Sequence, residues 1–379
     1  MVDYVNKALK LVILPDDDMI PVLEQNMGNA RFVWNKILSV YTQLYELSKS
    51  GDFSISPSIS ILNKILMKLK SEYPFLREGE STSQQQVFRD LNKAFTNFFK
   101  HGFGYPQYKS KRNSKQSFRI QKVGNNIKIT NKRIGLAKLG YVKYRTSKEY
   151  RKLLKSSKIN NVTVKRENGK YYAVVNIKTT VEEFEKTGKQ VGIDLGLKSL
   201  ATLSNGQVIA NLDLKREEEM IKKYQTKLSR QKYMGQNYKK TLQKYYKWQN
   251  RKNNKINNAY HHISKYLVKT FDLIVMEDLN IKGMIKNKKL SHKIHTSALH
   301  KLTYMIKYKA QWYSKEFKHI NRFFPSSKKC NNCGYIKKDL TLDIRKWFCP
   351  SCNTHHDRDI NAAINILNEG KKNFNIKNN

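Results

Sequence analysis

The feature that most constrains the fold of this chain is a set of four cysteines near its C-terminal end. They form two Cys-x2-Cys pairs separated by fifteen residues, namely Cys330, Cys333, Cys349 and Cys352. In zinc ribbons with this spacing, each pair places two thiolates on one side of a tetrahedral ion. We therefore expect one structural Zn²⁺ ion in a ribbon of residues 326–355, with His355 as an alternative ligand.

The charge of the chain indicates its partner. The sequence has 73 Lys and Arg against 30 Asp and Glu, a net charge of +43, which favours a polyanion such as nucleic acid. A membrane surface is the alternative, but no stretch approaches the roughly 18 apolar residues of a membrane span. Near the N-terminus only Leu11–Leu14 is continuously apolar, too short for a signal peptide. We expect a cytoplasmic protein with reduced thiols, which disfavours disulfides.

The N-terminal third combines a strand with helices. Ala8–Leu14 has the composition of a strand and ends at Pro15, and Asp16–Asp18 can cap the helix that follows. Further helical patterns cover Leu62–Leu69 and Gln85–Phe99. We expect a helical region over residues 16–102, inserted into a β domain formed by residues 1–15 and 103–187.

Two parts of this region are candidates for contact with nucleic acid. One is the start of a Gln-rich helix, where amide side chains could bond adenine edges, although such a helix start is often only solvated surface; its candidates are Gln84, Gln85 and Arg89. The other is the loop 102–119, where aromatic residues alternate with cations and acids are absent, a composition typical of single-strand binding. Its candidates are Tyr105, Lys109, Lys111 and Arg112, and a solvated linker is the alternative.

Residues 118–180 show the two-residue periodicity of strands. Asn168-Gly169 separates two such runs and predicts a β-hairpin, and Gly124-Asn125 separates two others. We expect a small, mostly antiparallel β barrel or sheet. Because the region contains no acid pair, no Ser/His pair and no Gly-rich phosphate loop, a binding role is the interpretation we favour.

Three acids in the second half of the chain are candidates for catalysis. Asp194 lies within the apolar strand Gln190–Gly196, and Glu277 ends the buried strand Leu273–Met276. Asp359 lies in the first turn of a helix whose apolar face includes Ile360, Ala363, Ile364 and Leu367. An acid inside an apolar strand is costly to bury unless it is paired or binds a metal. For a single acid we would favour a cap or an ion pair, and we keep that interpretation for Asp278 and Asp357. Each of the two would instead be the metal ligand if the assigned register were off by one or two residues.

Three carboxylates suit two Mg²⁺ ions, since hard cations prefer oxygen ligands. Two such ions about 3.5–4 Å apart can activate a water and stabilise the leaving oxygen of a phosphodiester. The sequence therefore predicts a magnesium-dependent nuclease site formed by Asp194, Glu277 and Asp359.

Between the first two acids lies a strongly basic helical segment, residues 213–269. From Met220 to Lys255 it contains twelve Lys and Arg and no acid, which favours a hairpin that follows phosphates over a merely solvated face. Its candidate contacts are Lys222, Lys223, Lys227, Arg230, Lys239 and Lys240.

Taken together, these motifs resemble those of one family. The chain resembles the TnpB (OrfB) proteins of bacterial insertion sequences in four motifs and in their order. These are GIDLG (Gly192–Gly196), VMEDLN (Val275–Asn280), the four-cysteine ribbon and DRDINAAINIL (Asp357–Leu367). The resemblance continues upstream, in segments that include Arg31–Lys36, Leu91–Lys100 and Tyr105–Lys111. The family also resembles type V CRISPR effectors.

The resemblance implies an RNA-guided DNA endonuclease. Its expected partners are a guide RNA encoded by the transposon end and double-stranded target DNA next to a short motif. The implied fold is a RuvC/RNase H-like α/β domain, residues 188–325 and 356–379, with an inserted zinc ribbon and a preceding β barrel that carries the helical insertion. Two alternatives remain: an RNA-guided repressor that does not cleave, and a RuvC-like nuclease that selects DNA structures without a guide.

Overall fold

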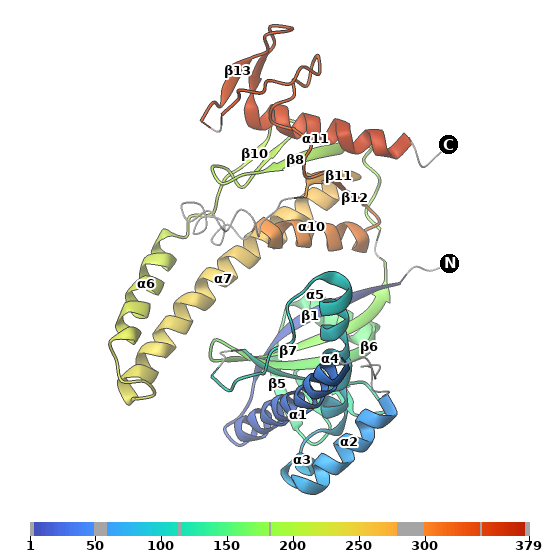
Figure 1. The fold of residues 1–379 in the computed structure, drawn as a ribbon, viewed down its shortest axis with the longest axis vertical. Helices are drawn as coiled ribbons and strands as arrows, with labels where there is room; N and C mark the ends of the chain where they lie inside the picture. The colour runs from blue at the N-terminus through green and yellow to red at the C-terminus, as the bar shows by residue number, and fades with distance from the viewer. Residues whose placement is uncertain are drawn as a thin grey trace. The chain divides into compact units, whose positions relative to one another are not determined.

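A computed structural model describes residues 4–48, 59–112, 115–181, 183–278, 299–341 and 343–375 (Figure 1). Its internal contacts divide the chain into two compact units, Met1–Thr180 and Val181–Asn379. Within the described ranges, no helix has both the length and the apolar character needed to cross a membrane.

The first unit is built on a seven-stranded antiparallel sheet with the order β2-β6-β7-β1-β5-β4-β3. The strands are β1 (Tyr4–Leu14), β2 (Gln116–Gln121), β3 (Ile127–Ile129), β4 (Arg133–Leu136), β5 (Gly140–Arg145), β6 (Lys158–Glu167) and β7 (Lys170–Thr180). The predicted hairpin at Asn168-Gly169 is confirmed, since it joins β6 to β7 and both residues have positive φ. The two antiparallel strands of this hairpin lie in the region where the sequence alternates with a period of two residues.

Of the two forms expected from the sequence, a barrel or a sheet, the described residues form an open sheet. In the described part of the chain, the edge strands β2 and β3 do not pair with each other. The turn at Gly124-Asn125 separates them, but β2 pairs with β6, and β3 pairs with β4. With only three residues, β3 offers too few backbone groups for an extended second ladder.

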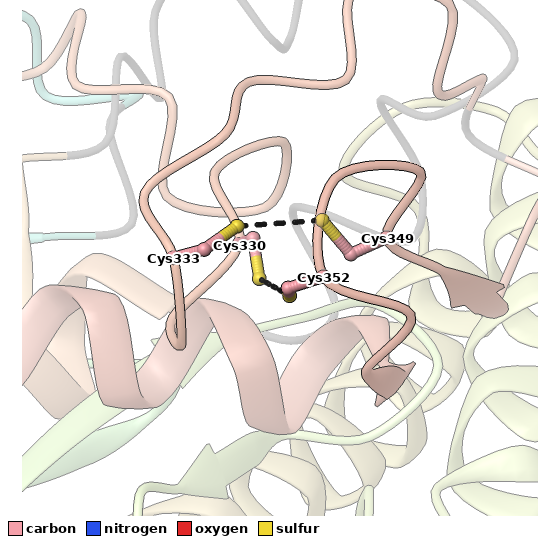
Figure 2. A group of neighbouring side chains, drawn as sticks. All are labelled: Cys330, Cys333, Cys349 and Cys352. Carbon is pink, nitrogen blue, oxygen red and sulfur yellow. Dashed lines mark hydrogen bonds between the residues drawn. The ribbon is translucent and has the colours of Figure 1, made fainter.

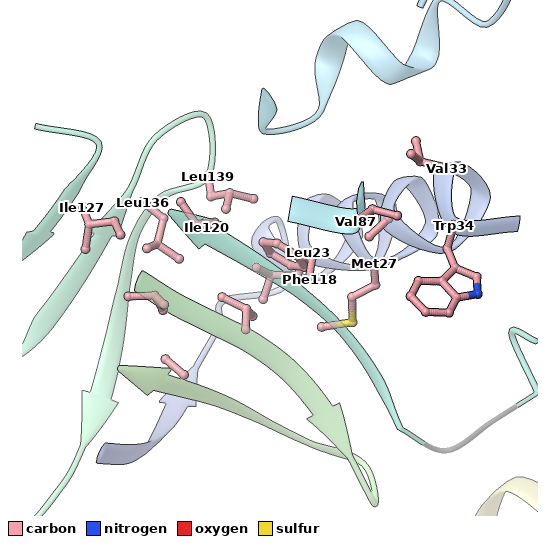
Figure 3. Packing of buried hydrophobic residues seen from close by; sticks show 14 of the residues in the cluster. Leu23, Met27, Val33, Trp34, Val87, Phe118, Ile120, Ile127, Leu136 and Leu139 are labelled. Carbon is pink, nitrogen blue, oxygen red and sulfur yellow. The ribbon is translucent and has the colours of Figure 1, made fainter. Parts of the chain in front are cut away.

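Helices inserted between β1 and β2 form the hydrophobic core with this sheet. They are α1 (Met19–Ser48), α2 (Ile59–Glu72), α3 (Phe75–Glu78) and α4 (Ser81–His101), and α5 (Lys148–Ser156) follows β5. Figure 3 shows Leu23 and Met27 of α1 facing Phe118 of β2, with Val87 of α4 beside them. Their burial stabilises the helical insertion on the sheet, at roughly 1.5–3 kcal/mol for each large side chain.

The second unit contains a five-stranded sheet with the order β10-β9-β8-β11-β12. The strands are β8 (Gln190–Leu195), β9 (Ala201–Leu203), β10 (Val208–Ile209), β11 (Leu273–Glu277) and β12 (Glu316–Ile320). The first three form an antiparallel meander, and β8, β11 and β12 run parallel. Parallel strands need helical crossovers, which the long segment after β10 supplies.

Helices cover both faces of this sheet. Helices α7 (Gln236–Thr270) and α10 (Leu299–Trp312) cover one face and α11 (Arg358–Asn375) covers the other, whereas α6 (Lys215–Ser229) packs on α7. On one face, Ile274 and Met276 of β11 pack with side chains of α7 and α10 such as Leu267 and Ile306. On the other face, Val275 packs with Ile366 of α11. The period-two alternation of β11 therefore determines which helix each of its residues contacts.

A small two-stranded ribbon, β13 (Lys346–Phe348) and β14 (His355–Asp357), lies between β12 and α11 in the sequence. Trp347 and Leu340 form its core together with Cys330 and Cys349. Because so few apolar residues are buried, the ribbon has little core of its own, as is usual where a metal supplies the stability.

Candidate active site and four-cysteine cluster

Asp194 and Glu277 lie side by side on neighbouring parallel strands. In the pairing of β8 with β11, Ile193 is opposite Met276, and the two acids are the next residues on their strands. Since side chains alternate along a strand, Asp194 lies on the same face as Gly192, and Glu277 on the same face as Val275. Both acids therefore lie at the carboxyl ends of their strands, on the face that α11 covers.

Helix α11 can approach this face because Gly192 has no side chain. A Cβ atom at Gly192 would meet the backbone of α11, at the carbonyl oxygen of Ala363 and, 2.6 Å away, the nitrogen of Leu367. Asp359 is four residues before Ala363, so it lies one turn nearer the N-terminus on the same face of the helix. This close packing brings the first turn of α11 to the acids at the end of the sheet.

The electrostatics of the site indicate that the three carboxylates lie near one another. Burial raises the pKa of Asp194 well above its ordinary value, and the nearby carboxylates of Glu277 and Asp359 raise it further. Arg358 and Arg345 act in the opposite direction. Burial also raises the pKa of Glu277. Carboxylates held together in this way repel each other, and a divalent cation relieves that repulsion.

The acids adjacent to the candidates have other partners. Asp357 accepts hydrogen bonds from the backbone nitrogens of Asp359 at 3.0 Å and Ile360 at 3.1 Å, so it caps α11. Asp278 pairs with Arg322 at 2.6 Å. The interpretation of these two acids as a cap and an ion pair is therefore confirmed. The last two residues of the VMEDLN motif, Leu279 and Asn280, lie outside the described residues.

Sequence analysis did not identify two residues that contact the carboxylates. Arg345, from the ribbon, lies with its guanidinium 3.3 Å from Asp359 Oδ1. Ser326 donates a hydrogen bond from its hydroxyl to Glu277 Oε1. Both come from the segment around the cysteines, which only the folded chain brings to the sheet.

The four cysteines converge as their spacing predicts. Their sulfur atoms all lie within 4.8 Å of one another. Figure 2 shows Cys330 beside Cys352 and Cys333 beside Cys349, and the sulfurs of these two pairs are 3.6 Å and 3.5 Å apart. A tetrahedral zinc ion with Zn–S bonds of about 2.3 Å requires sulfurs about 3.8 Å apart, so the arrangement fits such an ion. Among the described residues, this is the group that converges tightly enough for a single ion.

The environments of the sulfurs differ. Burial raises the pKa of Cys330 to about 11, whereas hydrogen bonds from the hydroxyl and backbone of Thr354 lower the pKa of Cys352 to about 6. His356 is buried, and its Nε2 lies 3.0 Å from Cys330 Sγ. His355, the alternative ligand expected from the sequence, is instead exposed and packs against Phe348. The alternation of β14 places His356 inward and His355 outward, which corrects that expectation.

The candidate contacts on α4 have different environments. Gln84 is fully buried, and its Nε2 donates to the carbonyl oxygen of Leu76 at 2.7 Å. It is therefore unable to reach a base in this structure, and the prediction for this residue is wrong. Gln85 and Arg89 are both exposed, and their four-residue spacing places them on one face of the helix.

The basic loop is partly anchored to α1. Lys109 Nζ lies 3.6 Å from the centre of the Trp34 ring, and burial lowers its pKa. Tyr105 is half-buried among aromatic rings of α1 and α4, and its hydroxyl lies 3.0 Å from that of Thr42. Lys111 and Arg112 are exposed. Lys109 is exposed as well, so all three candidate cations of the loop are accessible, and Lys109 lies over an aromatic ring.

The helices α6 and α7 form the basic hairpin, as predicted. Buried Glu217 pairs with Arg251 at 3.1 Å and with Lys255 at 3.4 Å, so some of the cations hold the two helices together. The six candidate contacts, by contrast, are exposed and form no ion pair with any described residue: Lys222, Lys223, Lys227, Arg230, Lys239 and Lys240.

Three family models match parts of the chain. Residues 160–288 match the OrfB IS605 model, described as "Probable transposase", and residues 300–366 match "Cas12f1-like, TNB domain". Residues 1–50 match a model described as "Helix-turn-helix domain"; the described part of that range, residues 4–48, contains β1 and α1.

Relatives cover nearly the whole chain. The "Putative RNA-guided DNA endonuclease" of Streptomyces pristinaespiralis is 33% identical over 98% of this chain and 90% of the relative. The protein InsQ of Escherichia coli K12, which carries the same description, is 26% identical over 96% of this chain and 92% of its own. A solved Cas12f1 structure, in complex with sgRNA and target DNA, shares the fold, with a TM-score of 0.55 and 13% identity over 96% of this chain and 99% of that one. The chain belongs to the TnpB (OrfB) family, which is related to the type V CRISPR effectors.

Proposed function

We propose that this protein is an RNA-guided DNA endonuclease of an insertion sequence, which cleaves double-stranded DNA next to a short target-adjacent motif. The observation that carries the proposal is the alignment of Asp194 and Glu277 at the carboxyl ends of β8 and β11, on the face against which α11, with Asp359 in its first turn, packs closely. The names of the relatives, and the sgRNA and target DNA of the Cas12f1 complex, support the same activity and the same partners.

The three carboxylates would hold two Mg²⁺ ions. Bound there, the ions would supply an activated water and neutralise the leaving oxygen in hydrolysis of a phosphodiester. Asp194, whose raised pKa favours the protonated form, must release its proton to act as a ligand. The guanidinium of Arg345 beside Asp359 places a positive charge where a scissile phosphate would approach.

The rest of the chain would recognise nucleic acid. Base pairing with the guide would select the sequence, while the protein grips backbone phosphates; the exposed cations of α6 and α7 are suited to that task. We assign residues 188–325 and 356–379 to a RuvC-like nuclease domain, 326–355 to a ribbon with one structural Zn²⁺ ion, 1–15 and 103–187 to a wedge-like β domain and 16–102 to a recognition insertion. Gln85, Arg89, Tyr105, Lys109, Lys111 and Arg112 remain candidates for contact with the DNA motif or the RNA.

A plasmid-cleavage assay with purified protein tests the proposal. RNA that co-purifies with the protein is sequenced first, and a plasmid that matches its guide segment is offered with and without that RNA, in Mg²⁺ or EDTA. We expect cutting only with both RNA and Mg²⁺. Cutting without RNA would favour a structure-selective nuclease, and RNA-dependent binding without cutting would favour a repressor.

The variant Asp194→Ala separates chemistry from binding. It should abolish cutting and leave the affinity for RNA and for target DNA nearly unchanged, because the side chain would ligate the ions without holding the nucleic acids. A filter-binding or gel-shift measurement that showed binding lost together with cutting would contradict a purely catalytic role for Asp194.

A further inference from the structure

The segment that leads from β12 to the first cysteine contacts the carboxylate site directly. Ser326 is buried, with 5% of its surface exposed, and its hydroxyl donates a hydrogen bond to Glu277 Oε1. A serine hydroxyl that donates to one carboxylate oxygen fixes the rotamer of that carboxylate and leaves its second oxygen for another ligand. The adjacent residue, Ser327, forms no side-chain hydrogen bond with any described residue and is half-exposed.

Two asparagines of α11 hold this segment in place. Asn365 Nδ2 donates to the carbonyl oxygens of Ser326 at 2.9 Å and Lys329 at 2.6 Å. Asn361 Nδ2 donates to Lys329 at 2.8 Å, and its Oδ1 accepts from the backbone nitrogen of Asn331 at 3.0 Å. Both amides are almost completely buried, and buried amides are retained in a helix where their hydrogen bonds are satisfied by the tertiary structure.

The hydrogen bonds form a continuous path from the cysteine cluster to Glu277. Asn331 directly follows Cys330, so its bond to Asn361 ties the first cysteine turn to α11. Asn365 lies one helical turn after Asn361, on the same face, and binds the backbone of Ser326. Helix α11 also carries Asp359 in its first turn. One helix therefore positions one carboxylate directly and a second one through Ser326.

We propose that Ser326 is a positioning residue for Glu277, held by Asn361 and Asn365, so that the fold around the four cysteines determines the orientation of this carboxylate. The inference deepens the proposed function and rests on it, because Glu277 is a metal ligand only if the nuclease site is real. Groups that orient metal ligands from behind typically contribute 10–100-fold to metal affinity. Ser326 therefore acts on cation binding and has no direct role in binding nucleic acid.

The test compares Ser326→Ala, which removes the hydroxyl, with Ser326→Thr, which retains it, and with Ser327→Ala as the matched control. Binding of Mn²⁺ to the full chain without RNA is measured by electron paramagnetic resonance of the free ion. We expect an affinity about tenfold weaker for Ser326→Ala, and near-parental affinities for Ser326→Thr and Ser327→Ala. In the guide complex, the Mg²⁺ concentration for half-maximal cleavage should rise by a similar factor.

The zinc content and the melting temperature distinguish positioning from folding. Both should be retained in Ser326→Ala, since the amide contacts to the backbone carbonyl of Ser326 do not depend on its hydroxyl. If Ser326→Ala bound less zinc and melted at a lower temperature, together with a weaker Mn²⁺ affinity, Ser326 would act through folding. That result would overturn the inference.

A further variant separates the inference from the proposed function. If Glu277→Gln leaves the Mn²⁺ affinity of the chain unchanged, both the site and the role of Ser326 are overturned. If Glu277→Gln weakens Mn²⁺ binding but Ser326→Ala does not, the inference alone is overturned. If both variants weaken Mn²⁺ binding, combining them should cost no more than Glu277→Gln alone, because Ser326 would act only through that carboxylate.

Discussion

A single methyl group at Gly192 should move Asp359 away from the other two candidate acids, Asp194 and Glu277. In Gly192→Ala, the new Cβ would meet the carbonyl oxygen of Ala363 and lie 2.6 Å from the nitrogen and 2.9 Å from the Cβ of Leu367. Two of these three atoms belong to the backbone of α11, so no rotamer change can relieve the clash. Helix α11 must move away from β8, and Asp359 moves with it.

The size of the effect follows from the contact distances. Restoring ordinary van der Waals separation, about 3.5 Å or more, requires a shift of about 1 Å. A misplacement of about 1 Å in a catalytic arrangement can cost about 10²-fold in rate, whereas overpacking a core typically costs about 1–3 kcal/mol of stability. We therefore expect a large loss of cleavage with a drop in melting temperature of no more than about 10 °C.

The variant Gly370→Ala is the matched control. Its Cβ would lie 2.5 Å and 2.6 Å from the two methyl groups of Val275 and 3.1 Å from the Cβ of that residue. Because Val275 is buried and β-branched, α11 must shift here too, but at the end of the helix away from Asp359. The position is eleven residues after Asp359 on the same helix, and a gain in helix propensity of up to about 1 kcal/mol offsets part of the strain. We expect a stability cost similar to or below that of Gly192→Ala and a much smaller loss of cleavage.

The assay is single-turnover cleavage by the guide complex at saturating Mg²⁺, with thermal unfolding measured in parallel. If Gly192→Ala cleaved at the parental rate, close packing of α11 on β8 would not set the position of Asp359, and the reasoning would be refuted. Equal losses in Gly192→Ala and Gly370→Ala would also contradict it, since they would indicate a general effect of destabilisation.

Three further predictions follow from the structure. Replacing Cys330 and Cys333 with Ser should remove about one zinc ion per chain, as measured by elemental analysis, and lower the melting temperature; unchanged zinc and unchanged melting would contradict a metal-held ribbon. The double variant Lys222→Gln, Lys223→Gln should weaken nucleic acid binding and reduce the slope of log affinity against log salt by about 1–2, whereas a parental slope would exclude these residues as phosphate contacts. Because its pKa is raised, Asp194 stays protonated up to a higher pH than an ordinary carboxyl group does. The Mg²⁺ concentration needed for half-maximal cleavage should therefore increase as the pH falls toward that raised pKa. A Mg²⁺ concentration that does not change with pH would contradict this prediction.

The sequence alone determined the local features of this protein. The Cys-x2-Cys pairs, the Asn168-Gly169 turn and the apolar runs around Asp194 and Glu277 each depend on interactions among nearby residues, so their patterns could be recognised in the sequence. For Gln84, the pattern was misleading. Its polarity predicted exposure, but the packing of α4 beside Leu76 buries it and supplies its hydrogen bond.

Only the tertiary structure decided which distant residues meet. The parallel pairing of β8 with β11 aligns Asp194 with Glu277, and the absence of a side chain at Gly192 lets α11 bring Asp359 to them. The contacts of Ser326 and Arg345 with the acids likewise join segments far apart in the chain. Such contacts leave no periodic signal in the sequence, because they arise from the packing of whole elements against each other.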